Sequence, residues 1–188
     1  MKINVPINIS ARHVHLTKDI YEKLFDSDIT VYKELNQVGQ FAANECVTIK
    51  TKKGEFNNVR IVGPLRLYNQ VEISKSDARV LGINPPVRTS GDLEGAEVIT
   101  IKTDKAEVTL PCVIIADRHV HMNPKFAEEL GVNNGEKLML AINSEKKGII
   151  ELSAKISDDG FFEVHLDTDD ANAFLITSNM EGILFKKD

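Results

Sequence analysis

The sequence predicts a mainly β protein with short α-helices, arranged as two similar small β-barrel domains related by internal duplication. The first observation is a repeated motif: SARHVHL at residues 10–16 returns as ADRHVHM at residues 116–122, so that His13 and His119 lie 106 residues apart. The second is that short apolar or β-branched segments alternate with turn-forming residues along much of the chain, which favours strands.

A second repeated segment supports the duplication. VEISKSDA at 71–78 aligns with VHLDTDDA at 164–171, a spacing of 93 residues, and Glu72 stands where the second copy has His165. The spacings of 106 and 93 differ by 13 residues, which indicates a longer loop in the first copy. We expect the boundary near residues 93–97 and assign 1–94 to the first barrel and 95–188 to the second.

Each half is expected to follow the same order of elements. β-rich approach segments over 7–10 and 112–115 lead into the two motifs, and a short helix follows each motif. Thr17 and Asn123 suit the N-cap positions of these helices. Pro124 suits the first helical position that follows Asn123, and Gly131 is placed to end that helix.

A hairpin and a second short helix complete each half. Residues 52–55 and 144–148 contain the Lys, Glu, Ser and Gly of hairpin turns between apolar segments. Short capped helices are predicted over 76–81 and 168–174, the first of them ended by Gly82. We therefore expect each half to be a small barrel with short helices.

Composition excludes several classes of protein. The 188 residues are 42% hydrophobic and 27% charged, as in folded globular chains, and a net charge of -5 argues against a non-specific nucleic-acid partner. No segment approaches the roughly 18 apolar residues that a membrane span needs, and the N-terminus does not resemble a signal peptide. We expect a cytoplasmic protein in which Cys46 and Cys112 are buried thiols.

The five histidines of the chain all fall inside the repeated motifs. In an extended segment residues i and i+2 point to one side, so each His-Val-His presents two imidazoles together. Glu72 and His165 each add a donor to one pair. The predicted metal ligands form two sets: His13, His15 and Glu72 in the first half, and His119, His121 and His165 in the second.

A single His-x-His pair in a strand is more often solvated or hydrogen-bonded than metal-binding. Its duplication, in a chain that uses histidine nowhere else, favours the metal interpretation. Three protein ligands with a vacant fourth position are typical of catalytic zinc, although cobalt, nickel and iron are chemically admissible.

Arginines accompany both motifs. Arg12 and Arg118 precede the histidine pairs, and we expect structural ion pairs with acids such as Asp77 and Asp170. Arg66 stands six residues before Glu72, an even separation that in a strand would place both on one face. An arginine near a divalent cation suits an anionic substrate such as phosphate.

These residues carry a resemblance that extends over nearly the whole chain. The sequence resembles the PduL-type phosphotransacylases, also called phosphate propanoyltransferases. The matching segments, in family order, are residues 9–16 (ISARHVHL), 63–66 (GPLR), 70–74 (QVEIS), 86–91 (PVRTSG), 117–122 (DRHVHM) and 164–173 (VHLDTDDANA).

The resemblance implies an enzyme that interconverts a short-chain acyl-CoA (propanoyl-CoA or acetyl-CoA) plus phosphate with acyl phosphate plus CoA. It implies two barrels, two zinc ions and Arg66 as the catalytic, phosphate-binding residue. It further implies coenzyme A contacts at Ile9, Ser10, Ala11, Lys53, Arg60 and Asn172. Relatives in bacterial microcompartments carry an N-terminal extension, and few residues precede the first motif here, which favours a cytoplasmic enzyme.

Two other functions stay open from the sequence. A dizinc acyl-CoA thioesterase would use hydroxide in place of phosphate, and a non-enzymatic metal-binding β module would have coordinatively closed sites. The inequivalent pair Glu72 and His165 disfavours the module, because purely structural duplication gives no reason for two different ligand sets. A homo-oligomer also stays possible.

Overall fold

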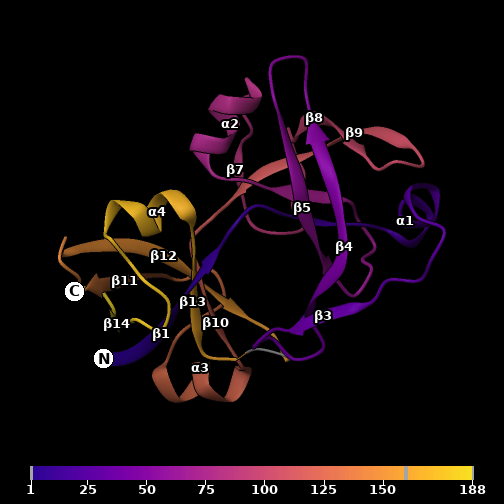
Figure 1. Cartoon of the computed structure of the whole chain (residues 1–188). Helices are drawn as coiled ribbons and strands as arrows, with labels where there is room; N and C mark the ends of the chain where they lie inside the picture. The colour runs from indigo at the N-terminus through magenta and orange to yellow at the C-terminus, as the bar shows by residue number, and fades with distance from the viewer. Residues whose placement is uncertain (1, 159–160, 188) are drawn as a thin grey trace. The chain divides into compact units, whose positions relative to one another are not determined.

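The computed structural model describes residues 2–158 and 161–187, and it confirms a mainly β chain with short helices (Figure 1). The chain divides into two compact units, one formed by Ala11–Ala116 and the other by Met1–Ser10 together with Asp117–Asp188. Each unit contains its own closed ladder of six strands.

The barrel of Ala11–Ala116 closes in the order β4-β5-β2-β6-β9-β8, with β8 pairing back onto β4. Two short strands, β3 and β7, lie outside this ring on β4 and β9. The elements of the unit are β2 (His13–His15), α1 (Lys18–Leu24), β3 (Val31–Glu34), β4 (Phe41–Lys50), β5 (Glu55–Gly63), β6 (Gln70–Glu72), α2 (Lys75–Leu81), β7 (Val87–Arg88), β8 (Glu97–Lys102) and β9 (Glu107–Ala116).

The other barrel closes in the order β1-β13-β10-β12-β11-β14. Its histidine strand, β10, lies between β12 and β13, just as β2 lies between β5 and β6. The elements are β1 (Lys2–Ser10), β10 (His119–Met122), α3 (Pro124–Leu130), β11 (Lys137–Ile142), β12 (Gly148–Ile156), β13 (Glu163–Asp167), α4 (Thr168–Ala173) and β14 (Glu181–Phe185).

The expected boundary between residues 94 and 95 falls inside the first of these barrels. β8 and β9 follow that position in the chain, yet they complete the ring of Ala11–Ala116 because β9 pairs with β6 and β8 pairs with β4. β1 leads into the first motif but pairs with β13 and β14 in the other barrel. Each approach strand therefore closes the barrel of the opposite sequence repeat.

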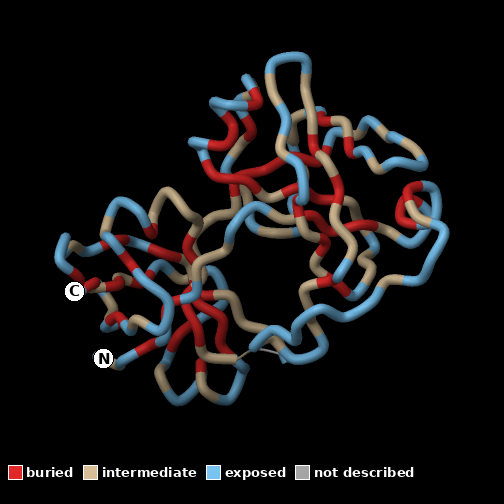
Figure 2. The backbone as a smooth tube through the Cα atoms, in the orientation of Figure 1, coloured by how far each residue is buried: buried red, intermediate tan, exposed pale blue. Residues whose placement is uncertain are grey.

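Apolar residues fill the interior of each barrel, as the buried segments along the strands show (Figure 2). Two separate clusters of buried side chains form, one containing Val14, Ile61 and Leu81, and the other containing Val120, Leu138 and Leu184. Each barrel therefore has its own hydrophobic core.

The helix ends agree with the capping residues expected from the sequence. Asn123 accepts the backbone N–H of Phe126, Pro124 opens α3, and Gly131 ends it in the left-handed conformation at φ 63°. Gly82 ends α2 in the same way at φ 65°. Thr17 occupies the N-cap position of α1 without a side-chain capping bond. Helices α1 and α3 each follow a motif strand, whereas α2 follows β6.

Candidate metal centres

The two His-Val-His segments form the short strands β2 and β10, and their alternation sets the orientation of the imidazoles. Val14 and Val120 are fully buried in the two barrel cores. Since successive side chains of a strand point to opposite faces, the histidines on either side of each valine lie on the outer face of their barrel.

The first triad forms across the antiparallel pair β2 and β6, where His13 lies directly opposite Glu72. The Nε2 atom of His13 is 3.6 Å from Oε2 of Glu72, and Nε2 of His15 is 4.0 Å from Oε1. One donor atom from each of the three residues lies within 4.8 Å of the others. The structure thus brings the predicted first ligand set together.

The second triad forms in the same register on β10 and β13, where His119 lies opposite His165. The Nε2 atoms of His119 and His121 are 3.1 Å apart. The donor atoms of His119, His121 and His165 again lie within 4.8 Å of one another. Within the described residues, the duplication of the sequence becomes a duplication of a three-donor cluster.

Backbone carbonyls hold three of the imidazoles by their Nδ1 atoms. The Nδ1 atom of His13 lies 2.9 Å from the backbone oxygen of Ala11, and that of His15 lies 2.9 Å from the backbone oxygen of Val62. The Nδ1 atom of His119 lies 2.8 Å from the backbone oxygen of Asp117. A carbonyl only accepts, so Nδ1 carries the proton in each ring and Nε2 keeps a lone pair. That is the tautomer a metal ligand requires when Nδ1 is held from behind.

Burial keeps His15 and His121 neutral. It lowers the pKa of His121 to about 2, assisted by the neighbouring His119, His165 and Lys155. Burial also lowers the pKa of His15, and the neighbouring His13 and Arg66 act in the same direction. Only a neutral imidazole has a lone pair to give a metal ion, so both side chains are in the ligand form at neutral pH.

The donor sets fit a transition-metal ion. Tetrahedral zinc with Zn–N bonds of 2.0–2.1 Å separates two ligand nitrogens by about 3.3 Å, close to the spacing of His119 and His121. Nδ1 of His121 is buried and has no hydrogen-bond partner among the described residues. The triads can each hold a metal ion, and their chemistry admits more than one metal.

The two motif arginines form the expected ion pairs. Nη2 of Arg12 lies 2.7 Å from Oδ1 of Asp77. Arg118 makes two bonds to Asp170, from Nε at 2.8 Å and from Nη2 at 2.6 Å. Both acids lie on the short helix that follows the third ligand, so each pair ties a histidine strand to that helix.

Arg66 lies in the loop before β6 and not within a strand, so its even spacing from Glu72 does not explain its position. The backbone N–H of Arg66 donates to the Leu16 carbonyl at 2.8 Å, next to the histidine strand. Its positive charge acts in the direction that lowers the pKa of His15. Nε of Arg66 is buried and lacks a hydrogen-bond partner in the described chain.

The residues expected to contact coenzyme A are distributed over both units. Ile9 and Ser10 lie at the end of β1, which contacts α4, where Asn172 lies. Ala11, Lys53 and Arg60 belong to the other unit, with Lys53 in the β4–β5 turn. Arg60 lies opposite His13 in the β2–β5 ladder, its guanidinium 4.5 Å from the ring centre of Tyr32, and it donates to the Ala43 carbonyl.

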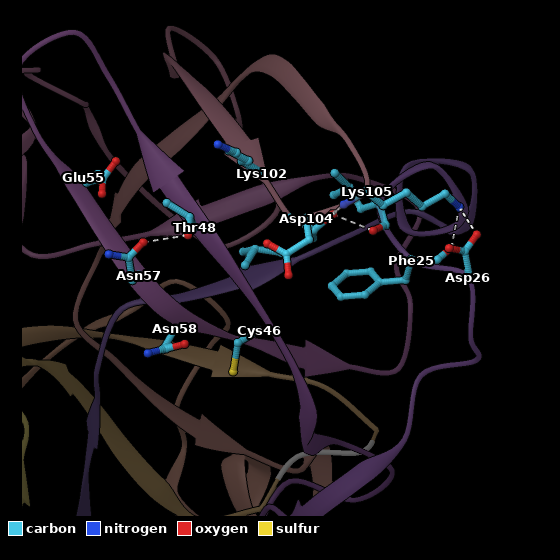
Figure 3. A pocket seen from close by; sticks show the side chains of 13 residues that line it. Phe25, Asp26, Cys46, Thr48, Glu55, Asn57, Asn58, Lys102, Asp104 and Lys105 are labelled. Carbon is cyan, nitrogen blue, oxygen red and sulfur yellow. Dashed lines mark hydrogen bonds and ion pairs between the residues drawn. The ribbon is translucent and has the colours of Figure 1, made fainter.

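An open pocket of about 570 Å³ lies elsewhere on the Ala11–Ala116 unit. The labelled side chains around it are mostly polar and partly satisfied by one another: Thr48 bonds to Asn57, and Lys105 pairs with Asp26 (Figure 3). Cys46 lies on its wall and is partly exposed, so its predicted burial is wrong, whereas Cys112 is buried. None of the triad residues lines this pocket.

The sequence interpretation missed two residues that contact the third ligands, Gln70 and Glu163. The side chain of Gln70 contacts Glu72, and that of Glu163 contacts His165. Their different residue types concealed the relation, but the 93-residue repeat that aligns Glu72 with His165 also aligns Gln70 with Glu163.

Among the described residues, no helix has the length and apolar character needed to cross a membrane.

Together, two six-stranded barrels with a three-donor cluster on the outer face of each define a duplicated β-barrel protein with two candidate metal centres. A sequence model of the phosphate propanoyltransferase family matches residues 6–177. The chain belongs to this family.

Individual relatives agree with the family match. Phosphate propanoyltransferases from Citrobacter freundii and Salmonella typhimurium are each 44% identical over 173 residues, covering 90% of this chain and 82% of the relative. The phosphate propanoyltransferase of Thermotoga maritima is 43% identical over 177 residues, covering 92% of this chain and 84% of the relative.

Proposed function

We propose that this chain is a zinc-dependent phosphate acyltransferase that interconverts short-chain acyl-CoA plus phosphate with acyl phosphate plus CoA. Propanoyl-CoA and acetyl-CoA are the proposed acyl donors. The observation that carries the proposal is the pair of three-donor clusters at repeat-equivalent positions, in a chain that belongs to the phosphate propanoyltransferase family.

Zinc is the proposed metal at both clusters because three nitrogen or carboxylate donors with an open fourth position are characteristic of catalytic zinc sites. Bound zinc would polarise the thioester carbonyl and stabilise the departing thiolate. The protein contributes neutral imidazoles whose Nδ1 atoms are fixed by backbone carbonyls at His13, His15 and His119.

Arg66 is the proposed phosphate-binding residue. Its positive charge acts to lower the pKa of His15, and its buried Nε has no hydrogen-bond partner among the described residues. A planar guanidinium can donate two parallel hydrogen bonds to phosphate oxygens. Arg66 would thereby orient phosphate beside the first cluster and offset part of its negative charge.

In the forward reaction a phosphate oxygen attacks the thioester carbonyl carbon, a C–O bond forms and the C–S bond breaks. The electron pair of that bond leaves with sulfur, and the CoA thiolate is released or takes up a proton from solvent. Alignment of the two substrates and charge stabilisation can supply the rate without a protein nucleophile. Burial raises the pKa of Cys112 to about 12, which disfavours its use as a thiolate.

The coenzyme A contacts proposed from the family resemblance are Ile9, Ser10, Ala11, Lys53, Arg60 and Asn172. Lys53 and Arg60 would supply positive charge to the phosphates of the coenzyme. A cytoplasmic location belongs to the same proposal and is supported by two free thiols, which are normal in reducing compartments.

The test is thiol release from propanoyl-CoA and acetyl-CoA with and without inorganic phosphate, combined with metal analysis of the purified protein. We expect two zinc ions per chain, phosphate-dependent thiol release and an equal amount of acyl phosphate. Thiol release at the same rate without phosphate, and without acyl phosphate, would identify a thioesterase instead. Absence of turnover with either donor, together with unfolding on chelation, would identify a structural metal-binding module.

A further inference from the structure

The residue two positions before each third ligand is buried and faces that ligand. Gln70 precedes Glu72 on β6, and Glu163 precedes His165 on β13. Gln70 is 0% exposed and Glu163 is 5% exposed. The two positions are related by the 93-residue repeat, so the duplication has kept a buried polar side chain here while changing its type.

In the first barrel the side-chain amide of Gln70 is held at both ends. Its Oε1 accepts the backbone N–H of Gly91 at 2.8 Å, which fixes the NH₂ group on the other side. The Nε2 atom then donates to Oε1 of Glu72 at 2.6 Å and to Oγ of Ser90 at 2.9 Å. Gln70 therefore presents a hydrogen-bond donor to a carboxylate.

In the second barrel the chemistry is reversed. Oε2 of Glu163 lies 2.9 Å from Nε2 of His165, and an ionised carboxylate can only accept. With the carboxylate as acceptor, Nε2 of His165 would carry the proton and Nδ1 would be the atom left to a metal ion. The amide of Asn8 lies farther from the same Nε2, at 3.4 Å. Glu163 presents a hydrogen-bond acceptor to an imidazole.

The two barrels thus contain the same arrangement with the residue types exchanged. The segment is Gln-Val-Glu in the first barrel and Glu-Val-His in the second. Across the ladder Gln70 lies opposite His15, and Glu163 lies opposite His121. Each triad together with Gln70 or Glu163 contains one carboxylate. In the first barrel this carboxylate is the third ligand, Glu72. In the second barrel it is Glu163, which contacts the third ligand.

We propose that Gln70 and Glu163 are positioning residues that orient the third ligands, Glu72 and His165, each matched to its ligand as donor to acceptor. Side chains behind a ligand typically contribute 10–100-fold to metal affinity by fixing its orientation and hydrogen-bonding state. Replacing one ligand type by the other without changing the residue behind it should therefore weaken binding. The inference rests on the proposed metal-binding role of the two triads.

The sharpest test transfers the second arrangement into the first barrel. In a His119→Ala, His121→Ala background, which removes the second centre, zinc affinity is measured by competition with a chromophoric chelator. Glu72→His alone leaves the Gln70 NH₂ facing an imidazole N–H. Adding Gln70→Glu restores an acceptor, and we expect it to recover about 10–100-fold in affinity. Equal affinities for the single and double replacements would overturn the proposal.

A second set of variants leaves both triads intact. It tests the positioning role even if the Glu72→His variants do not fold, as judged by circular dichroism without metal. Glu163→Leu should weaken zinc binding at the second centre by about 10–100-fold, and Glu163→Gln should recover part of this because its amide oxygen still accepts. Glu151→Gln, on an exposed position of β12, is the matched control and should bind zinc as the unaltered protein does. Unaltered zinc affinity in Glu163→Leu would refute the role of Glu163.

The unaltered protein separates this inference from the function on which it rests. If it binds no zinc, the proposed metal centres fail. If it binds two zinc ions and supports phosphate-dependent turnover, while the Glu163 and Gln70 variants bind zinc equally well, only the positioning role fails. Cobalt in place of zinc adds an absorption spectrum that reports ligand geometry independently of activity.

Discussion

Acid should destabilise the metal-free protein through its buried histidines, and His121 allows the effect to be isolated. The pKa of this side chain is lowered to about 2 in the folded barrel, from an ordinary value near 6.5. Above pH 6.5 the imidazole is neutral whether the chain is folded or unfolded, and there is no effect. Below that pH the unfolded chain binds a proton that the folded chain does not, so stability falls as pH falls.

The magnitude follows from the size of this window. Each pH unit between the two pKa values changes the free energy of unfolding by about 1.4 kcal/mol for one imidazole. Lowering the pH from 7 to 4.5 should therefore cost about 2.6 kcal/mol through His121 alone. Carboxylates add their own acid dependence, so the informative quantity is a difference between the unaltered protein and a variant that cannot titrate at this position.

The assay is urea denaturation at several pH values between 7 and 4.5, with a chelator present, for the unaltered protein and for His121→Leu. We expect the stability of the variant relative to the unaltered protein to improve by about 2.6 kcal/mol across the range. Phe161, whose ring is stacked on His121 at 5.0 Å, can pack against the replacement leucine. A relative stability that does not change with pH would show that burial does not keep this imidazole neutral.

Three further outcomes are expected. Arg66→Ala should raise the KM for phosphate at least about tenfold while zinc content stays unchanged, measured by steady-state kinetics and metal analysis; loss of zinc would contradict a role confined to phosphate. Leu138→Ala should cost about 2–5 kcal/mol in urea denaturation because Leu138 is fully buried, whereas Ile183→Ala, on the outer face of the same barrel, should cost less than about 1.5 kcal/mol. Chelation should abolish phosphate-dependent thiol release and preserve the far-ultraviolet circular dichroism spectrum, since each barrel has its own apolar core; unfolding would point to a structural metal.

The sequence predicted both triads because the relevant information is local and repeated. The i, i+2 spacing places His13 and His15 on one face of a strand, and the alignment of the two halves identifies Glu72 and His165 as equivalent. The structure brings each set of three together as the repeat indicates. Capping residues such as Asn123 and the two hairpin turns were likewise recognisable, because each depends on a few neighbouring residues.

Strand pairing was not predictable in the same way. β1 and β9 both lead into a histidine motif, and nothing in their apolar patterns specifies which distant strand accepts their hydrogen bonds. The boundary was expected near residue 94 because the sequence does not show that β8 and β9 pair with strands of the first repeat. Arg66 illustrates a related difficulty: the even spacing from Glu72 assumed a continuous strand, whereas β6 begins only at Gln70.

The pairing of β1 has a consequence for the order in which the protein can fold during synthesis. Ala11–Ala116 is one continuous segment, so its ring can close before the rest of the chain has left the ribosome. β1 emerges first but pairs with β13 and β14, which emerge last. A chain divided after residue 116 should accordingly yield a first fragment whose ring closes by itself and a second fragment, 117–188, whose ring stays open until β1 of the first fragment pairs with it.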